Sequence, residues 1–230
     1  MKLHHVVQGD GPTVVLLGSL GSTTAMWGPQ LPALRDFRVV RVDLPGHGGS
    51  TVPDRAFTIA EVAESVVGLV GEGASYCGIS FGGIVAMCIA AGTRINRLVL
   101  ACTKAAFPPA TQWDERAARV RREGMAAIED AVLSRWFVGD PPVWAREMFR
   151  GCSPEGYARC CEALRDADLG DDLARIVAPT LVIAGAEDPS VPVEESAALP
   201  GRLVLLDGAA HLASAEQSAA FNEALLAHLA

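Results

Sequence analysis

Residues 75–86 read Ser75-Tyr76-Cys77-Gly78-Ile79-Ser80-Phe81-Gly82-Gly83-Ile84-Val85-Ala86. The residues before Ser80 are typical of a buried strand, and the small and apolar residues after it are typical of a helix. A sharp turn between the two would expose the Ser80 hydroxyl, and Gly78 and Gly82 would leave room where a Cβ atom would collide. We therefore predict that Ser80 is a nucleophile at a helix N-terminus, where backbone dipoles favour a developing negative charge.

The chain on both sides of this segment alternates short apolar runs with stretches of helical periodicity. One helical stretch begins with Thr58 and Glu61 at the spacing of a capping box. Leu3–Val7 is expected to add an antiparallel edge strand. Buried parallel strands are predicted at Thr13–Leu17, Arg38–Val42, Ala74–Cys77, Leu98–Ala101, Thr180–Ala184 and Leu203–Leu206. Such alternation predicts an α/β fold with a mostly parallel, doubly wound sheet.

The alternation stops between residues 105 and 172, where helical stretches follow one another without a convincing strand. We interpret this segment as an inserted helical cap. The expected organisation is a core of residues 1–104 and 173–230, with a cap of residues 105–172. Ligands of open α/β sheets bind beyond the carboxyl ends of the strands, so the cap would cover that crevice.

A serine hydroxyl is a poor nucleophile near neutral pH, so Ser80 needs a base and an acid. His211 follows the last apolar strand, and an acid lies in the loop after the preceding one. Asp188 and Glu187 are neighbours in that loop, and pattern alone does not separate them. His47 also follows a strand, and we interpret it as a hydrogen-bond partner of a glycine-rich turn. The order serine, acid, histidine is that of a hydrolytic triad.

An oxyanion hole requires backbone N–H groups aimed at the substrate carbonyl oxygen. Phe81, directly after the nucleophile, is expected to supply one. Leu20, in the Gly18–Ser22 turn after the first central strand, is expected to supply the other. Both residues would act through their backbone, with their side chains in the pocket wall.

The composition excludes several classes of function. The 230 residues are 50% apolar with a net charge of −8, which predicts a single domain and argues against nucleic-acid or membrane partners. Six cysteines without a CxxC pair, and a start at Met1 without the pattern of a signal peptide, predict a cytoplasmic protein. The oligomeric state stays open, since monomer and homo-oligomer fit equally.

Together these motifs resemble 3-oxoadipate enol-lactonases, the α/β-hydrolases of aromatic-acid catabolism, over nearly the whole chain. The general segments are Gly18–Gly21, Asp43–Ser50, Cys77–Gly83, Pro179–Pro192 and Ala209–Glu216, and the cap segments are Gly124–Ala126, Ser134–Phe137, Glu155–Tyr157 and Arg165–Leu169. The family spacing favours Asp188 over Glu187 as the acid. The chain departs from the family in lacking a first additional strand and in shorter stretches at 71–75 and 92–96.

The resemblance implies a carboxylic ester hydrolase that opens 3-oxoadipate enol-lactone through an acyl-enzyme on Ser80. No metal or organic cofactor is implied. The small-molecule lactone carries a carboxylate, for which Arg135 is the first candidate ligand and Lys104 the second. Trp136 is expected in the cap core or the pocket wall. The alternatives are another esterase or lactonase with a different small substrate, or an inactive hydrolase-fold binding protein.

Overall fold

Seven strands form one sheet in the computed structural model, which describes residues 1–230. Their order across the sheet is β1-β3-β2-β4-β5-β6-β7, and only β1 runs antiparallel to its neighbour. The strands are β1 (His5–Gln8), β2 (Thr13–Leu17), β3 (Arg38–Val42), β4 (Ser75–Ile79), β5 (Leu98–Ala101), β6 (Thr180–Gly185) and β7 (Arg202–Leu206). The predicted mostly parallel sheet with an antiparallel edge strand is therefore confirmed.

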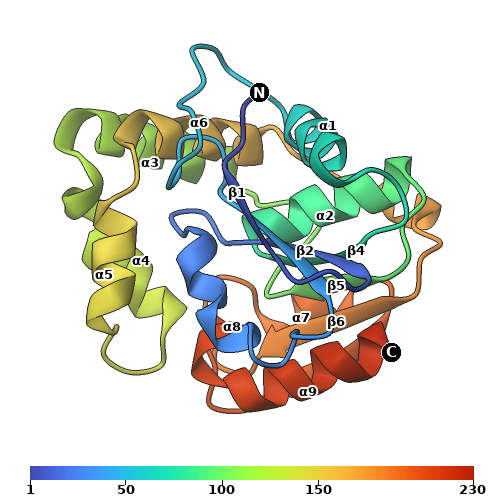
Figure 1. Ribbon diagram of the computed structural model, residues 1–230. Coiled ribbons are helices and arrows are strands. Elements are labelled where there is room, and N and C mark those ends of the chain that lie inside the picture. The colour runs from blue at the N-terminus through green and yellow to red at the C-terminus, as the bar shows by residue number, and fades with distance from the viewer.

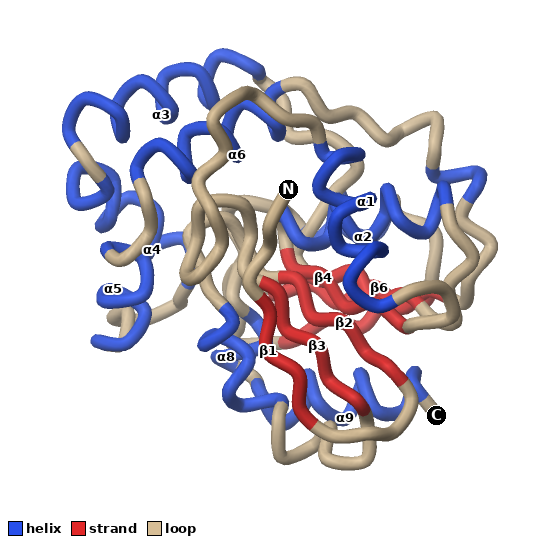
Figure 2. The backbone as a smooth tube through the Cα atoms, turned by 45° about the horizontal axis from the view of Figure 1, so that its top comes forward, coloured by secondary structure: helices blue, strands red, loops and turns tan.

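Helices cover both faces of this sheet (Figure 1). Helices α1 (Ile59–Val70) and α2 (Phe81–Gly92) lie on one face, and α9 (Ser218–Leu229) lies on the other (Figure 2). The shorter elements are η1 (Thr24–Gln30), η3 (Leu173–Arg175), α7 (Val193–Ala197) and α8 (Ala213–Glu216). The capping box predicted at Thr58 and Glu61 is present at the start of α1. None of the helices is both long and apolar enough to cross a membrane.

The segment between β5 and β6 consists of helices that lie beside the core in one group (Figure 1). They are α3 (Ala110–Glu123), η2 (Met125–Ile128), α4 (Glu129–Trp136), α5 (Val143–Arg150) and α6 (Pro154–Arg165). An isolated bridge between Ala106 and Asp168 joins the two ends of the segment. The inserted helical segment is as expected, while the boundaries 105 and 172 stay a prediction. We call residues 105–172 the cap.

The bounds of four strands, β1, β4, β6 and β7, differ from the sequence prediction: β6 ends at Gly185, and β7 begins at Arg202. Strand β4 runs on to Ile79, because Gly78 and Ile79 continue the ladder with Leu100 and Ala101 of β5. Strand β1 begins at His5 and not at Leu3, since the ladder with β3 starts with the pair His5 and Val42. Pairing partners from distant parts of the chain set these limits, and a local apolar pattern does not contain them.

Candidate functional site

Ser80 lies at the apex of the turn between β4 and α2, with φ of 55°. A residue other than glycine pays a conformational cost at positive φ, so the surrounding structure must hold it there. The Ser80 N–H donates to the Ala101 carbonyl at 3.0 Å, and its carbonyl accepts from Thr103 Oγ1 at 2.8 Å. Neighbours on β5 and just after it thus fix the strained turn.

Gly82 explains why the turn needs a small residue on its helical side. A Cβ atom at this position would lie 2.1 Å from the Leu17 carbonyl oxygen at the end of β2. The first turn of α2 therefore packs directly on the β2 backbone. This close approach brings the Ser80 hydroxyl and the loop after β2 to the same end of the sheet.

Asp188 and His211 lie together at this end of the sheet. His211 Nδ1 is 2.8 Å from Asp188 Oδ2, and both side chains are buried. The other carboxylate oxygen accepts from the N–H groups of Ser190 and Val191 at 2.8 and 3.1 Å. Because an ionised carboxylate only accepts, Nδ1 carries the proton and Nε2 of His211 is left free to act as a base.

Glu187, the alternative acid, has a different role in the structure. Its side chain is exposed and accepts from the N–H groups of Gly208 and Ala209 at 3.3 and 3.0 Å. It therefore stabilises the turn that leads to His211 and makes no contact with the imidazole.

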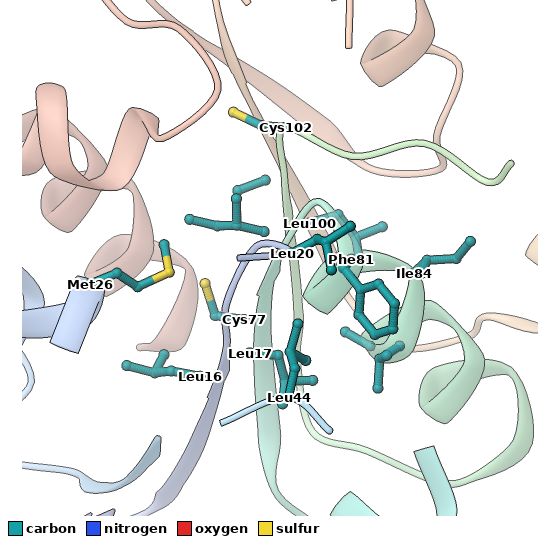
Figure 3. Close-up of a cluster of buried hydrophobic side chains, with 14 of the residues drawn as sticks. Leu16, Leu17, Leu20, Met26, Leu44, Cys77, Phe81, Ile84, Leu100 and Cys102 are labelled. Carbon is teal, nitrogen blue, oxygen red and sulfur yellow. The ribbon is translucent and has the colours of Figure 1, made fainter. Parts of the chain in front are cut away.

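The two backbone donors expected for an oxyanion hole are free of other partners. Neither the Leu20 N–H nor the Phe81 N–H donates a hydrogen bond within the protein. The Leu20 side chain lines the pocket, as expected. The Phe81 side chain does not: it is fully buried among apolar side chains that include Leu17 (Figure 3). Residue 81 begins α2, and its side chain belongs to the buried apolar core and does not line the cavity, so our pocket-wall prediction for it is wrong.

A cavity of about 170 Å³ lies between the core and the cap. Ser80 and His211 both line it, and the cap contributes Arg116, Arg135 and Trp136. A space of this size suits a small molecule. Of the side chains predicted from the sequence for the pocket, all but that of Phe81 line this cavity.

The cations that line the cavity differ in their partners. Lys104 Nζ forms an ion pair with Glu195 at 2.5 Å and lies 5.4 Å from the centre of the Phe107 ring. The Arg135 guanidinium has neither an ion pair nor a hydrogen bond, and its side chain is exposed. The structure therefore leaves Arg135 available to an anion, whereas the charge of Lys104 is already balanced.

Arg116 is a pocket cation that our reading of the sequence missed. Its guanidinium carbon lies 4.8 Å from the centre of the Trp113 ring, and it forms no ion pair with a carboxylate. A signal was present: Trp113, Ala117 and Val120 form the buried face of α3, and Arg116 stands three residues after Trp113 beside that face.

Trp136 belongs both to the cavity wall and to the packing of the cap. It is 3% exposed, and its ring meets Phe149 edge to face with centroids 5.7 Å apart. Both roles that we considered for Trp136 therefore hold at once.

The end of α4 is hydrogen-bonded directly to the loop that carries His211. The N–H groups of His211 and Leu212 donate to the carbonyls of Arg135 and Trp136 at 3.3 and 3.0 Å. Glu216 adds a second connection, since its carboxylate accepts from the N–H groups of Val138 and Ala210 at 2.7 and 2.6 Å. Burial raises the pKa of Glu216. The cap and the candidate base are thus held in one framework.

No cluster of three or more His, Cys, Asp or Glu side chains is placed to hold a metal ion. All six cysteines are free, and burial raises the pKa of Cys77, Cys102, Cys152, Cys160 and Cys161 above the ordinary thiol range. The cavity therefore offers a candidate nucleophile, Ser80, and a candidate base, His211.

Comparison with known proteins gives consistent matches over nearly the whole chain. A sequence model described as the alpha/beta hydrolase family matches residues 14–224. The chain is 35% identical to 3-oxoadipate enol-lactonase 2 of Acinetobacter baylyi, over 95% of this chain and 88% of that protein. It is 31% identical to a putative carbamate hydrolase of Stutzerimonas stutzeri, over 100% of this chain and 96% of that protein.

The crystal structure of the enol-lactonase from Burkholderia xenovorans LB400 is also similar, with a TM-score of 0.94 and 37% sequence identity. The superposition covers 99% of this chain and 96% of that one. The cap as well as the core is therefore shared with a solved enol-lactonase.

Proposed function

The chain belongs to the alpha/beta hydrolase family and cleaves an ester or lactone, and we propose that its substrate is 3-oxoadipate enol-lactone, in the catabolism of aromatic compounds. One observation carries the proposal. The cavity that Ser80 shares with His211 also exposes the unpaired guanidinium of Arg135, so an ester carbonyl and a carboxylate fit into one small space. The similarity of this chain to proteins named as enol-lactonases supports the same substrate.

The reaction begins with attack of Ser80 Oγ on the lactone carbonyl carbon. His211 Nε2 takes the hydroxyl proton, and the Asp188 carboxylate stabilises the imidazolium that forms. The N–H groups of Leu20 and Phe81 donate to the oxyanion.

Collapse of the tetrahedral intermediate then breaks the bond between the carbonyl carbon and the ring oxygen. The leaving group is an enolate, which takes up the proton held by the His211 imidazolium and so returns His211 to its neutral form; the enolate is far less basic than an alkoxide and needs little assistance to leave. Tautomerisation of the enol gives the ketone of 3-oxoadipate. Water, activated by His211, hydrolyses the acyl-enzyme and restores Ser80. The chemistry uses no metal or cofactor.

Arg135 and Arg116 provide the charge that recognises the substrate carboxylate. A guanidinium binds a carboxylate through two parallel hydrogen bonds, and neither arginine has to give up an ion pair to do so. Lys104 is less suited, because Glu195 already occupies it.

A pair of matched lactones tests the proposal. Alpha-angelica lactone has the same enol-lactone ring with a methyl group in place of the carboxymethyl group. We expect kcat/KM for 3-oxoadipate enol-lactone to exceed that for alpha-angelica lactone by roughly 10- to 100-fold, the effect of a charge-assisted hydrogen bond. Loss of the ring absorbance in the ultraviolet gives both rates. Equal rates, or faster turnover of p-nitrophenyl acetate than of either lactone, would point to a different small ester or lactone. If none of the three substrates reacts, a binding role replaces the hydrolase proposal.

A further inference from the structure

His47 is a fully buried histidine that the proposed reaction does not use. Its Nδ1 lies 2.9 Å from the Pro45 carbonyl oxygen, and its Nε2 lies 3.0 Å from the Gly21 backbone nitrogen. A carbonyl can only accept, so Nδ1 must carry the proton. A backbone N–H can only donate, so Nε2 must be bare. Both contacts thus require the neutral ring with one particular tautomer.

Gly21, which donates its N–H to His47, directly follows Leu20 in the chain. Within this turn the Ser19 carbonyl accepts from Ser22 N and Oγ at 3.0 and 2.7 Å. Since the peptide is trans, the Leu20 N–H on its other side points away from Ser22. His47 fixes the following peptide through Gly21 N–H. The two contacts together set the direction of the Leu20 donor.

The cap holds the same turn from the opposite side. Cys152 Sγ donates to the Gly21 carbonyl at 3.4 Å, and a Cβ atom on Gly21 would lie 2.7 Å from the Phe149 ring. The His47 ring itself packs on Tyr157 of α6, with centroids 6.2 Å apart. At Gly21 the turn is packed tightly against the cap, so a movement of this residue toward Phe149 is blocked.

The loop that carries His47 is anchored by the buried carboxylate of Asp43. It accepts from the N–H groups of Thr24 and Gly49 at 2.6 and 3.0 Å, and it pairs with His4 Nδ1 at 2.7 Å. Burial lowers the pKa of His47 to about 4, although the Pro45 carbonyl and the Asp43 charge act in the opposite direction. The ring is therefore neutral at any ordinary assay pH.

We propose that His47 is a positioning residue, whose bare Nε2 holds the Leu20–Gly21 peptide so that the Leu20 N–H points at the oxyanion. This inference rests on the proposed function in one respect, since it needs a reaction with an oxyanion. It holds for any ester or lactone that Ser80 attacks. His47 touches neither the substrate nor the reacting atoms, and it acts through the turn.

Two variants of similar size separate the two contacts of the ring. In His47→Gln, the side-chain oxygen reaches the place of Nε2 and can accept from Gly21 N–H. In His47→Asn, the shorter amide reaches the place of Nδ1 and can still donate to Pro45, but Gly21 loses its acceptor. His228→Asn serves as the control, because His228 lies on α9, its Nε2 is 3.1 Å from the Pro179 carbonyl oxygen, and it does not line the cavity.

We expect His47→Asn to lower kcat by about 10- to 100-fold with little change in KM, because a misplaced oxyanion donor weakens binding of the transition state only. His47→Gln should recover most of this loss. Rates are to be measured with p-nitrophenyl acetate and with the enol-lactone, per folded enzyme as judged by circular dichroism. Equal kcat in the two variants, whether retained or lost, would overturn the proposal, since a purely structural histidine would not distinguish them.

Nitrogen NMR of the histidine rings gives a readout that does not depend on activity. The expected spectrum has a protonated Nδ1 and a bare Nε2 at His47, and the Gly21 amide should exchange slowly in the wild type and fast in His47→Asn. A protonated Nε2 would overturn the inference. If the wild type hydrolyses neither substrate, the proposed function fails. The ring spectrum then tests only the hydrogen bond from the Gly21 N–H to His47 Nε2.

Discussion

The two residues that we expected to bind the substrate carboxylate differ in their surroundings. Lys104 is 14% exposed and is paired with Glu195, whereas Arg135 has no ion pair and lies at the end of α4 beside Trp136. A cation already bound to a carboxylate must lose that partner before it can bind another. The structure therefore favours Arg135 for this role.

Removal of the Arg135 guanidinium tests this assignment. We expect Arg135→Ala to raise KM for the enol-lactone by roughly 10- to 100-fold with little change in kcat, because the lost contact is the same in the ground state and the transition state. KM for the uncharged p-nitrophenyl acetate should not change. Arg119→Ala is the matched control, since Arg119 is paired with Glu123 and does not line the cavity. An unchanged KM for the enol-lactone in Arg135→Ala would remove this residue from the site.

The motif specifies the candidate catalytic residues more completely than the residues that would bind the substrate. Ser80 and His211 stand in patterns that local backbone geometry demands, so one sequence is enough to propose them. Arg116 and the pairing of Lys104 depend on which helix packs against which, and no local pattern contains that information. The choice between Asp188 and Glu187 is of the same kind, since the direction of each side chain decides it.

Among the elements, the contact between α2 and β2 determines where the candidate nucleophile lies. Gly82 in the first turn of α2 has the Leu17 carbonyl where a Cβ would stand, while Gly92 at the other end of the same helix has no atom within 4 Å of that place. A methyl group added at Gly82 would therefore collide with the β2 backbone, whereas one added at Gly92 of the same helix would not.

We expect Gly82→Ala to destabilise the protein by about 1–3 kcal/mol and to lower kcat, because α2 must move away from β2 and carry Ser80 with it. Gly92→Ala should leave kcat unchanged and raise stability by about 0.4–1 kcal/mol, through a less flexible unfolded chain. Urea unfolding and p-nitrophenyl acetate turnover measure both effects. Normal stability in Gly82→Ala would contradict the packing described here.

The elements themselves follow from the sequence because each apolar run is long enough to be a strand and is bounded by turn residues. The apolar runs do not determine the residue at which each strand ends. Strand β4 continues to Ile79 because β5 offers partners there, and that pairing joins residues about twenty positions apart. Register is a property of two strands, so a single run cannot specify it.

Across the whole molecule, the cap and the core meet at the candidate catalytic residues as well as at the two ends of the cap. Backbone hydrogen bonds join the His211 loop to the end of α4, and His47 lies between the core loop and α6. The sequence predicts a cap over the site, but these contacts join segments that are far apart in the chain. They follow from the three-dimensional arrangement alone.

His47 also makes the stability of the whole fold depend on pH. Its pKa is about 4 in the folded protein and near 6.5 in the unfolded chain, so the unfolded state binds more protons between these values. The free energy of unfolding should therefore be greatest above pH 6.5 and fall by about 3 kcal/mol as the pH is lowered toward 4. Partly buried His228, with a lowered pKa, adds an effect of the same sign.

Urea unfolding at a series of pH values between 4 and 7 checks this dependence. In His47→Gln, which has no group that titrates in this range, the slope should be much reduced. The same slope in the wild type and in the variant would show that other groups cause it.

Ser80 is proposed as the nucleophile that opens the enol-lactone. The most direct test of this proposal is the hydrolysis of freshly prepared 3-oxoadipate enol-lactone by the wild type and by Ser80→Ala, followed by loss of ultraviolet absorbance. We expect rapid turnover by the wild type and a loss on the order of 10⁴-fold or more in the variant, with its circular dichroism unchanged. Turnover that persists in a folded Ser80→Ala protein would contradict the proposal.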